Sequence, residues 1–84
     1  MLTHRCSREN ETLRKVLKSF RKEVGLTQGE LALRLGVPQS FVSKYECGER
    51  TLSFVDVHLI CHALTVPFSN ICHRFEEEIG APRT

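Results

Sequence analysis

The feature that most constrains this chain is the stretch at residues 28–46, QGELALRLGVPQSFVSKYE. Apolar residues recur at helical spacing in its first half, and the pattern resumes after the break GVP. Gly36 stands where a helix can end with positive φ, and Pro38 fixes φ for the first turn of a following helix. The stretch therefore predicts two short helices joined by a tight turn, with apolar faces made by Leu31, Ala32, Leu35, Phe41, Val42 and Tyr45.

Helices are also predicted on both sides of this stretch. Before it, Ser7 or Asn10 can cap a helix that runs to about Val24, and the core face of this helix is marked by Leu13, Val16, Leu17, Phe20 and Val24. After it, apolar spacing predicts one helix to about residue 64 or 65 and another at about 68–79. We therefore predict an all-α, compact five-helix domain at residues 10–80, preceded by a flexible segment at residues 1–9.

Two of the predicted helices begin with the spacing of a capping box. Thr27 with Glu30, and Ser53 with Asp56, have the pattern in which the side chain of each residue accepts a hydrogen bond from the backbone N–H of the other. These pairs place the starts of the second and fourth helices at residues 28 and 54.

Composition limits the class of protein without identifying it. The chain of 84 residues has room for one domain with a small core, and its net charge is only +2. No apolar run is long enough to span a membrane and the N-terminus has no apolar signal core, so we expect a cytoplasmic protein without membrane association. The four cysteines form no CxxC pair, and we expect them to be reduced.

The central motif also resembles a known family. LTQGELALRLGVPQSFVSKYECGER is similar to the helix-turn-helix of the lambda-repressor and Cro-like (XRE) regulators, and the similarity extends from about Leu13 to Ile71. The resemblance implies a lambda-repressor-like DNA-binding domain whose third helix enters the major groove of double-stranded DNA. We expect a transcriptional regulator that acts on a two-fold symmetric operator as a homodimer, in the role of a repressor. In the family, glycine is usual near Thr65, so a β-branched residue there predicts either a different helix ending or strain.

Candidate DNA contacts lie on the third helix and beside it. The side chains suited to base edges are those of Gln39, Ser40, Ser43 and Lys44, although ordinary polar surface would look the same. The predicted phosphate contacts are Gln28, at a helix N-terminus, and Arg50, after the motif. In the family, the residue at Gln28 also braces the one at Gln39. Phe41 could contact a thymine methyl or pack on the domain.

The resemblance further implies a structural ion pair. Arg21 and Glu46 match a family pair that connects the first helix to the end of the third. Such a pair would fix the angle of the third helix, and Arg21 would then not contact DNA. If the pair is partly buried, removing one partner costs several kcal/mol.

An unusual set of apolar residues predicts the dimer interface. Val55 and Leu59 lie one turn apart outside the usual core positions of the fourth helix, and Phe75 and Ile79 repeat this spacing on the fifth. An exposed apolar stripe on a small domain is typical of a partner surface. The alternative is a larger intramolecular core.

Other functions remain as alternatives. Nucleophile and base residues have no catalytic spacing, so we expect no enzyme and no cofactor. A metal site could be built from His58, Cys61, His62, Cys72 and His73, but core and surface roles explain these residues, and we predict no metal. The rival hypotheses are an antitoxin-type protein that binds a partner protein, and a sensor that responds to metal or thiol oxidation.

Overall fold

The computed structural model describes residues 7–80, which form five helices and no strand. The helices are α2 (Ser7–Val24), α3 (Gln28–Leu35), α4 (Gln39–Cys47), α5 (Phe54–Leu64) and α6 (Phe68–Ile79). The predicted all-α, five-helix fold is therefore confirmed.

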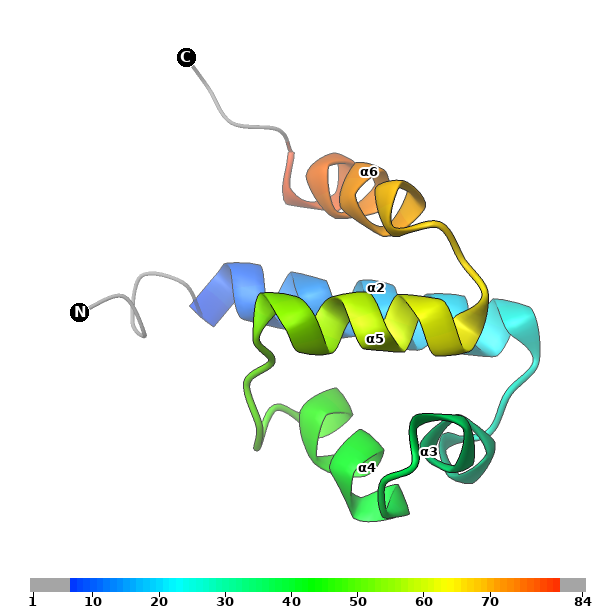
Figure 1. Ribbon diagram of the computed structural model, residues 1–84. Coiled ribbons are helices and arrows are strands. Elements are labelled where there is room, and N and C mark those ends of the chain that lie inside the picture. The colour runs from blue at the N-terminus through cyan, green and yellow to red at the C-terminus, as the bar shows by residue number, and fades with distance from the viewer. Residues whose placement is uncertain (1–6, 81–84) are drawn as a thin grey trace.

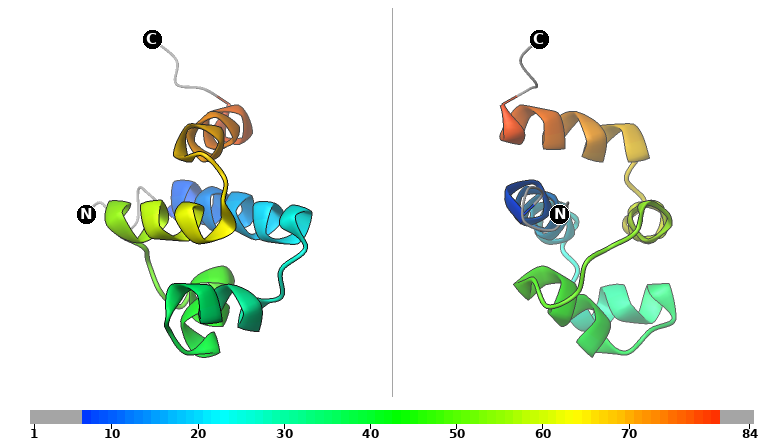
Figure 2. Two further views of the ribbon diagram at one scale, coloured as in Figure 1. Left: turned by 45° about the vertical axis from the view of Figure 1, so that its right-hand side comes forward. Right: turned by 90° about the vertical axis from the view of Figure 1, so that its left-hand side faces the viewer.

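The helices are arranged in three layers. In Figures 1 and 2, α2 and α5 run side by side through the middle, α6 crosses them on one side, and α3 with α4 lies on the other. The largest helix-to-helix contacts join α3 to α4 and α2 to α6. This arrangement leaves the α3–α4 unit at one end of the molecule, away from α6.

The core lies where these layers meet. Its fully buried members include Leu17 on α2, Leu31 on α3, Tyr45 on α4 and Leu64 on α5, and Ile71 extends it to α6. Val24 was predicted to face this core, but its side chain is 39% exposed at the last residue of α2.

Both predicted capping boxes are confirmed. The Thr27 hydroxyl accepts a hydrogen bond from the Glu30 N–H at 3.0 Å, and the Thr27 N–H donates to the Glu30 carboxylate at 2.9 Å. Ser53 and Asp56 form the same reciprocal pair, with both distances 3.0 Å. Each box satisfies two N–H groups that the first turn of a helix leaves without a partner.

The end of α5 settles the question raised by Thr65. Thr65 has a φ of 56° and ψ of 40°, and among residues 7–80 it is the one non-glycine residue with positive φ. Its N–H bonds to His62 O and the Val66 N–H bonds to Cys61 O, both at 3.0 Å. The helix therefore ends as it would with glycine, and the β-branched side chain makes this ending strained.

The prediction of a flexible segment at residues 1–9 is wrong for its last part. Helix α2 begins at Ser7, so residues 7–9 are helical, while residues 1–6 lie outside the described residues. The first turn is held by Arg8, whose Nη2 donates to the backbone oxygen of Ile79 at 2.9 Å. This long-range contact ties the start of α2 to the end of α6.

Among the described residues, no single helix is long and apolar enough to cross a membrane. Taken together, helices α5 and α6 would be long and apolar enough, but the chain bends by 114° at the break between them.

Candidate nucleic-acid interface

The α3–α4 unit is two short helices joined by a turn that local chemistry defines. Gly36 ends α3 with a φ of 73°, and the N–H of Val37 bonds back to the Ala32 oxygen at 3.0 Å. Pro38 then takes the N-cap position of α4 with a φ of −66°, directly before the first helical residue, Gln39. The turn thus redirects the chain within three residues.

Helix α4 has a buried side and an exposed side. Val42 and Tyr45 are fully buried against the core. Three of the four predicted base-contacting side chains, those of Gln39, Ser40 and Lys44, are exposed, whereas Ser43 is half-buried. The exposed strip therefore begins at the N-terminus of α4 and follows its outer side.

An ion pair fixes the other end of α4 to α2. Arg21 Nε donates to Glu46 Oε2 at 2.7 Å, Arg21 Nη2 donates to Glu46 Oε1 at 3.1 Å, and the two side chains are only 8% and 3% exposed. Arg21 Nη1 also donates to the backbone oxygen of Leu26 at 2.7 Å. The structure thus brings together the two residues that the family resemblance paired, and it adds an anchor to the loop that precedes α3.

Gln28 extends this ion pair to the tip of α4. Its Nε2 donates to Glu46 Oε1 at 2.9 Å, and its Oε1 accepts from Gln39 Nε2 at 3.5 Å, a long hydrogen bond. Arg21, Glu46, Gln28 and Gln39 therefore form a continuous chain from α2 to the exposed end of α4, which we call the Arg21–Gln39 relay. The sequence did not predict the hydrogen bond between Gln28 and Glu46, because these residues are 18 positions apart and no local pattern connects them.

Arg50, the second predicted phosphate contact, is exposed and lies beside α4. Its guanidinium carbon is 4.5 Å from the centre of the Phe41 ring, and that ring packs edge-on against Tyr45 at 5.9 Å. Phe41 is half-buried and packs against the core, in agreement with the packing role. The cation–π contact holds the Arg50 guanidinium over Phe41, in the N-terminal half of α4.

Comparison with known proteins decides the family. The sequence model of the Helix-turn-helix family matches residues 17–71, which include the whole α3–α4 unit. The chain belongs to the XRE-type helix-turn-helix family. The resemblance to lambda-repressor and Cro-like regulators is therefore confirmed, and the chain is a DNA-binding regulator of this class.

Individual members of the family agree with this assignment. An uncharacterized HTH-type transcriptional regulator from Methanothermobacter thermautotrophicus is 40% identical over 52 residues, which cover 62% of this chain and 75% of the relative. The crystal structure of the restriction-modification controller protein C.Esp1396I matches with a TM-score of 0.81 at 27% identity, over 84% of this chain and 92% of that chain. ClgR, the clp gene regulator of C. glutamicum, matches with a TM-score of 0.77 at 28% identity, over 84% and 92%.

In this helix-turn-helix protein the predicted dimer residues fall in two places. Val55 and Leu59 are 62% and 51% exposed on α5. Phe75 and Ile79 on α6 are half-buried, and Phe75 lines an apolar groove of about 500 Å³ between α2, α5 and α6. The groove also contains Phe54, which is 73% exposed.

Phe54 was not predicted as an interface residue. It directly follows the N-cap Ser53, and its ring packs edge-on against Phe68 at 5.1 Å. An apolar residue in the first turn of a capped helix was the one signal that could have identified it.

The residues weighed for a metal site lie on α5 and α6. Among residues 7–80 no group of three or more potential ligands comes together. His58 packs edge-on against Phe68 with ring centres 5.8 Å apart, and Cys61 is buried. Burial, and secondarily the neighbouring Cys72, raise the pKa of the Cys61 thiol to about 11, which keeps it protonated near neutral pH.

Proposed function

We propose that this XRE-type regulator is a repressor that binds a two-fold symmetric operator as a homodimer. The observation that carries the proposal is the Arg21–Gln39 relay. It bonds the C-terminal end of α4 to the buried Arg21 and the N-terminal end to the half-buried Gln28, while the strip from Gln39 to Lys44 faces outward. A rigid helix with an exposed polar strip is what reading of the major groove requires.

The base contacts follow from the chemistry of this strip. The amide of Gln39 can pair with adenine N6 and N7, and Lys44 can donate to guanine O6 and N7. Ser40 can bond to several base edges. Ser43 is half-buried, so its hydroxyl is less accessible to a base edge than that of the exposed Ser40.

The phosphate contacts use the start of α3 and the loop after α4. The capping box already occupies the N–H groups of Thr27 and Glu30. The Gln28 side chain is bonded to Glu46 and Gln39. Gln28 would therefore hold a phosphate through its backbone N–H at the positive end of the helix dipole. Arg50 would hold a second phosphate from the loop.

Dimerisation would use the apolar surface of α5 and α6, with Val55, Leu59, Phe75 and Ile79. One recognition helix reads only a few base pairs, whereas a two-fold dimer presents two helices about 34 Å apart, one turn of DNA. The related C.Esp1396I has been solved as a tetramer on its natural 35 base-pair operator. This precedent supports binding by more than one copy, and such an assembly on a promoter would block transcription.

Selection of bound sequences from a random DNA pool tests the DNA-binding proposal. We expect a two-fold symmetric consensus and a footprint with the same symmetry. Gln39→Ala should weaken binding to the preferred site by roughly 1–3 kcal/mol and relax base choice at one position per half-site. Asn70→Ala removes an exposed amide on α6 and serves as the matched control. Equal affinities for the two variants would contradict the assignment of α4 as the recognition helix.

Sedimentation equilibrium tests the dimer. Leu59→Asp places a charge in the proposed apolar interface and should give folded monomers that keep only weak, nonspecific DNA binding. Leu33→Asp makes the same change at a more exposed leucine on α3 and should remain dimeric. A wild-type monomer at micromolar concentration would refute the dimer. Copurification of a second small chain in its place would favour the antitoxin-type alternative.

A further inference from the structure

The apolar groove between α2, α5 and α6 has the size of a small-molecule site. Its volume of about 500 Å³ falls within the roughly 300–1,000 Å³ of pockets that hold drug-sized ligands. It lies on the side of α2 and α5 that faces α6, and we call it the Phe54 groove. Its apolar lining includes Leu13, Phe54, Val57, Phe68, Ile71 and Phe75.

Three phenylalanine rings give this groove an aromatic wall. Phe54 is 73% exposed, and its ring packs edge-on against Phe68 with ring centres 5.1 Å apart. Phe75 lines the groove from α6 and is half-buried. The face of an aromatic ring attracts a cation, and a large exposed ring gains from being covered by apolar surface. The wall therefore suits an occupant that combines an apolar body with a positive group.

Two carboxylates supply negative charge at the same groove. Glu9 on α2 and Glu76 on α6 both line it, and neither forms an ion pair among residues 7–80. One oxygen of Glu9, Oε1, is buried without a hydrogen-bond partner in this part of the chain, so Glu9 acts on an occupant through its charge. Glu76 is exposed, and its carboxylate is free to contact a cation directly.

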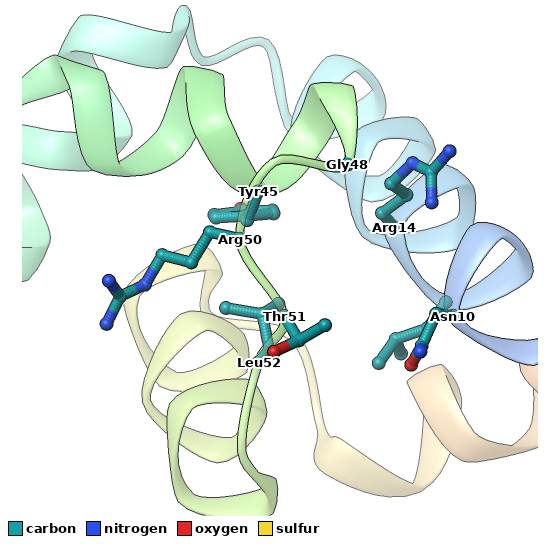
Figure 3. Close-up of a pocket in the computed structure, with 8 residues that line it drawn as sticks. Asn10, Arg14, Tyr45, Gly48, Arg50, Thr51 and Leu52 are labelled. Atoms are coloured by element: carbon teal, nitrogen blue, oxygen red, sulfur yellow. The ribbon is translucent and has the colours of Figure 1, made fainter. Parts of the chain in front are cut away.

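Positive side chains are absent from the lining. Among residues 7–80, no lysine, arginine or histidine lines the groove. Arg8, in the first turn of α2, is bonded to the backbone oxygen of Ile79 at 2.9 Å. Arg14 belongs to an adjoining pocket of about 210 Å³ that shares Asn10 with the groove, and Figure 3 shows its guanidinium beside Gly48 and pointing away from Asn10. The groove is therefore locally negative on a chain whose net charge is +2, which favours a cation over an anion.

We propose that the Phe54 groove binds a small hydrophobic organic cation, such as an alkyl or arylalkyl ammonium ion, as an effector of this regulator. The apolar body of the cation lies against the phenylalanine rings, and its ammonium group lies near Glu76 and Glu9. The occupant is a free small molecule, because the phosphates of DNA carry the same sign of charge as the groove.

The groove adjoins the proposed dimer surface, and this part of the inference rests on the proposed function. Phe75 belongs to both surfaces, whereas Val55 and Leu59 lie outside the groove. A cation that covers Phe75 withdraws this ring from the dimer contact. Binding therefore favours the monomer and lowers the affinity for a two-fold symmetric operator.

NMR titration of the full 84-residue chain tests the site without DNA. The probes are phenylbutylammonium, phenylbutanol and phenylbutyrate, which share a ring and a chain and differ in charge, at constant pH and ionic strength. The cation should give saturable shifts of the backbone amides of Phe54, Val57, Ile71 and Phe75, and should bind about fivefold more tightly than the alcohol. Binding of phenylbutyrate as tight as that of the cation would overturn the charge preference. Titration curves without saturation for all three probes would overturn the site.

The variant Leu59→Asp, which should be monomeric, distinguishes a small molecule from a second copy of the chain. The cation should saturate the groove amides of both the wild type and this variant. Saturation of the variant alone would show that a second copy covers the groove in the wild type, and would overturn the small-molecule site.

Two further variants separate the groove from general charge effects. Glu76→Gln should raise the dissociation constant of the cation about threefold and leave that of phenylbutanol unchanged. Glu78→Gln makes the same change at an exposed glutamate of α6 outside the groove and should alter neither constant. Equal weakening by the two variants would show nonspecific attraction and refute the role of Glu76. Phe54→Ala should weaken both probes, and unchanged affinities would refute the groove as the binding site.

The effector role is tested by sedimentation and on the selected operator. Saturating phenylbutylammonium should raise the dimer and operator dissociation constants of the wild type about fivefold, and phenylbutyrate at the same concentration should not. Binding at the groove with unaltered dimer and operator constants would refute the effector role alone. A wild type that is monomeric without any probe would contradict the proposed function and the effector role with it, while the NMR titration would still decide the groove.

Discussion

Truncation of Glu46 is the sharpest test of how this fold holds its recognition helix. Glu46 accepts two hydrogen bonds from Arg21 and one from Gln28, at distances of 2.7–3.1 Å. Glu46→Ala removes all three acceptor contacts and leaves the guanidinium of Arg21 buried, with the Leu26 oxygen as its one remaining partner among residues 7–80. The loss therefore affects both the fold and the brace of Gln39.

The expected loss of stability is large for so small a domain. Breaking a buried ion pair by removing one partner costs about 3–5 kcal/mol, because the remaining charge is uncompensated. Domains of this size are stable by only about 5–15 kcal/mol in total. At about 4–8 °C per kcal/mol, the melting temperature should fall by at least about 12 °C.

Chemical denaturation and thermal melting measure this loss. Glu49→Ala is the matched control, since Glu49 is exposed, lies one turn further along the chain and has no ion pair among the described residues. Its stability should stay within about 0.5 kcal/mol of the wild type. Similar losses for the two variants would refute the structural role of the pair.

A double variant separates the fold from the positioning of α4. Arg21→Met with Glu46→Leu replaces the ion pair by apolar side chains, which is often neutral or stabilising at buried sites. Stability should then return toward that of the wild type. Operator affinity should stay low, because Gln28 has lost its acceptor and no longer braces Gln39. Recovery of both properties together would show that the Arg21–Gln39 relay serves the fold alone.

Three further predictions concern strain, burial and charge. Thr65→Gly should raise the free energy of unfolding by about 1 kcal/mol in denaturant melts, because glycine adopts the left-handed conformation without strain. A loss of stability would contradict the claim that Thr65 strains the end of α5. The folded state holds the Cys61 thiol protonated, with a pKa raised from 9.0 to about 11, so stability should fall as pH rises through this range. Thermal melts should show a smaller fall for Cys61→Ala, and an equal fall would contradict the burial effect. Operator binding should weaken with salt in proportion to the phosphates contacted, and Arg50→Gln should reduce the slope of log K against log salt by about one. An unchanged slope would remove Arg50 from the phosphate contacts.

The sequence alone determined the parts of the fold that depend on neighbours in the chain. The capping boxes at Thr27 and Ser53 and the turn at Gly36 join groups only a few residues apart. Their hydrogen bonds follow from residue type and spacing, so the starts of α3 and α5 could be predicted at the correct residues. Hydrophobic periodicity predicted that the helices exist, because each helix must bury one apolar face.

The sequence was less informative where a local rule competes with distant contacts. Residues 7–9 are polar and were expected to be loose, yet Arg8 bonds to the end of α6. Thr65 ends α5 in a conformation that glycine would favour. In both cases the contacts of the whole domain outweigh the local preference.

Only the tertiary structure decided the site. The pairing of Arg21 with Glu46 came from family resemblance, but the addition of Gln28 and the continuity to Gln39 depend on how α2, α3 and α4 cross. The burial of the Tyr45 hydroxyl, which has no hydrogen-bond partner within residues 7–80, likewise depends on which side chains surround it. Contacts between residues far apart in the chain are set by the packing of whole helices, and the spacing of residues in a sequence does not contain that geometry.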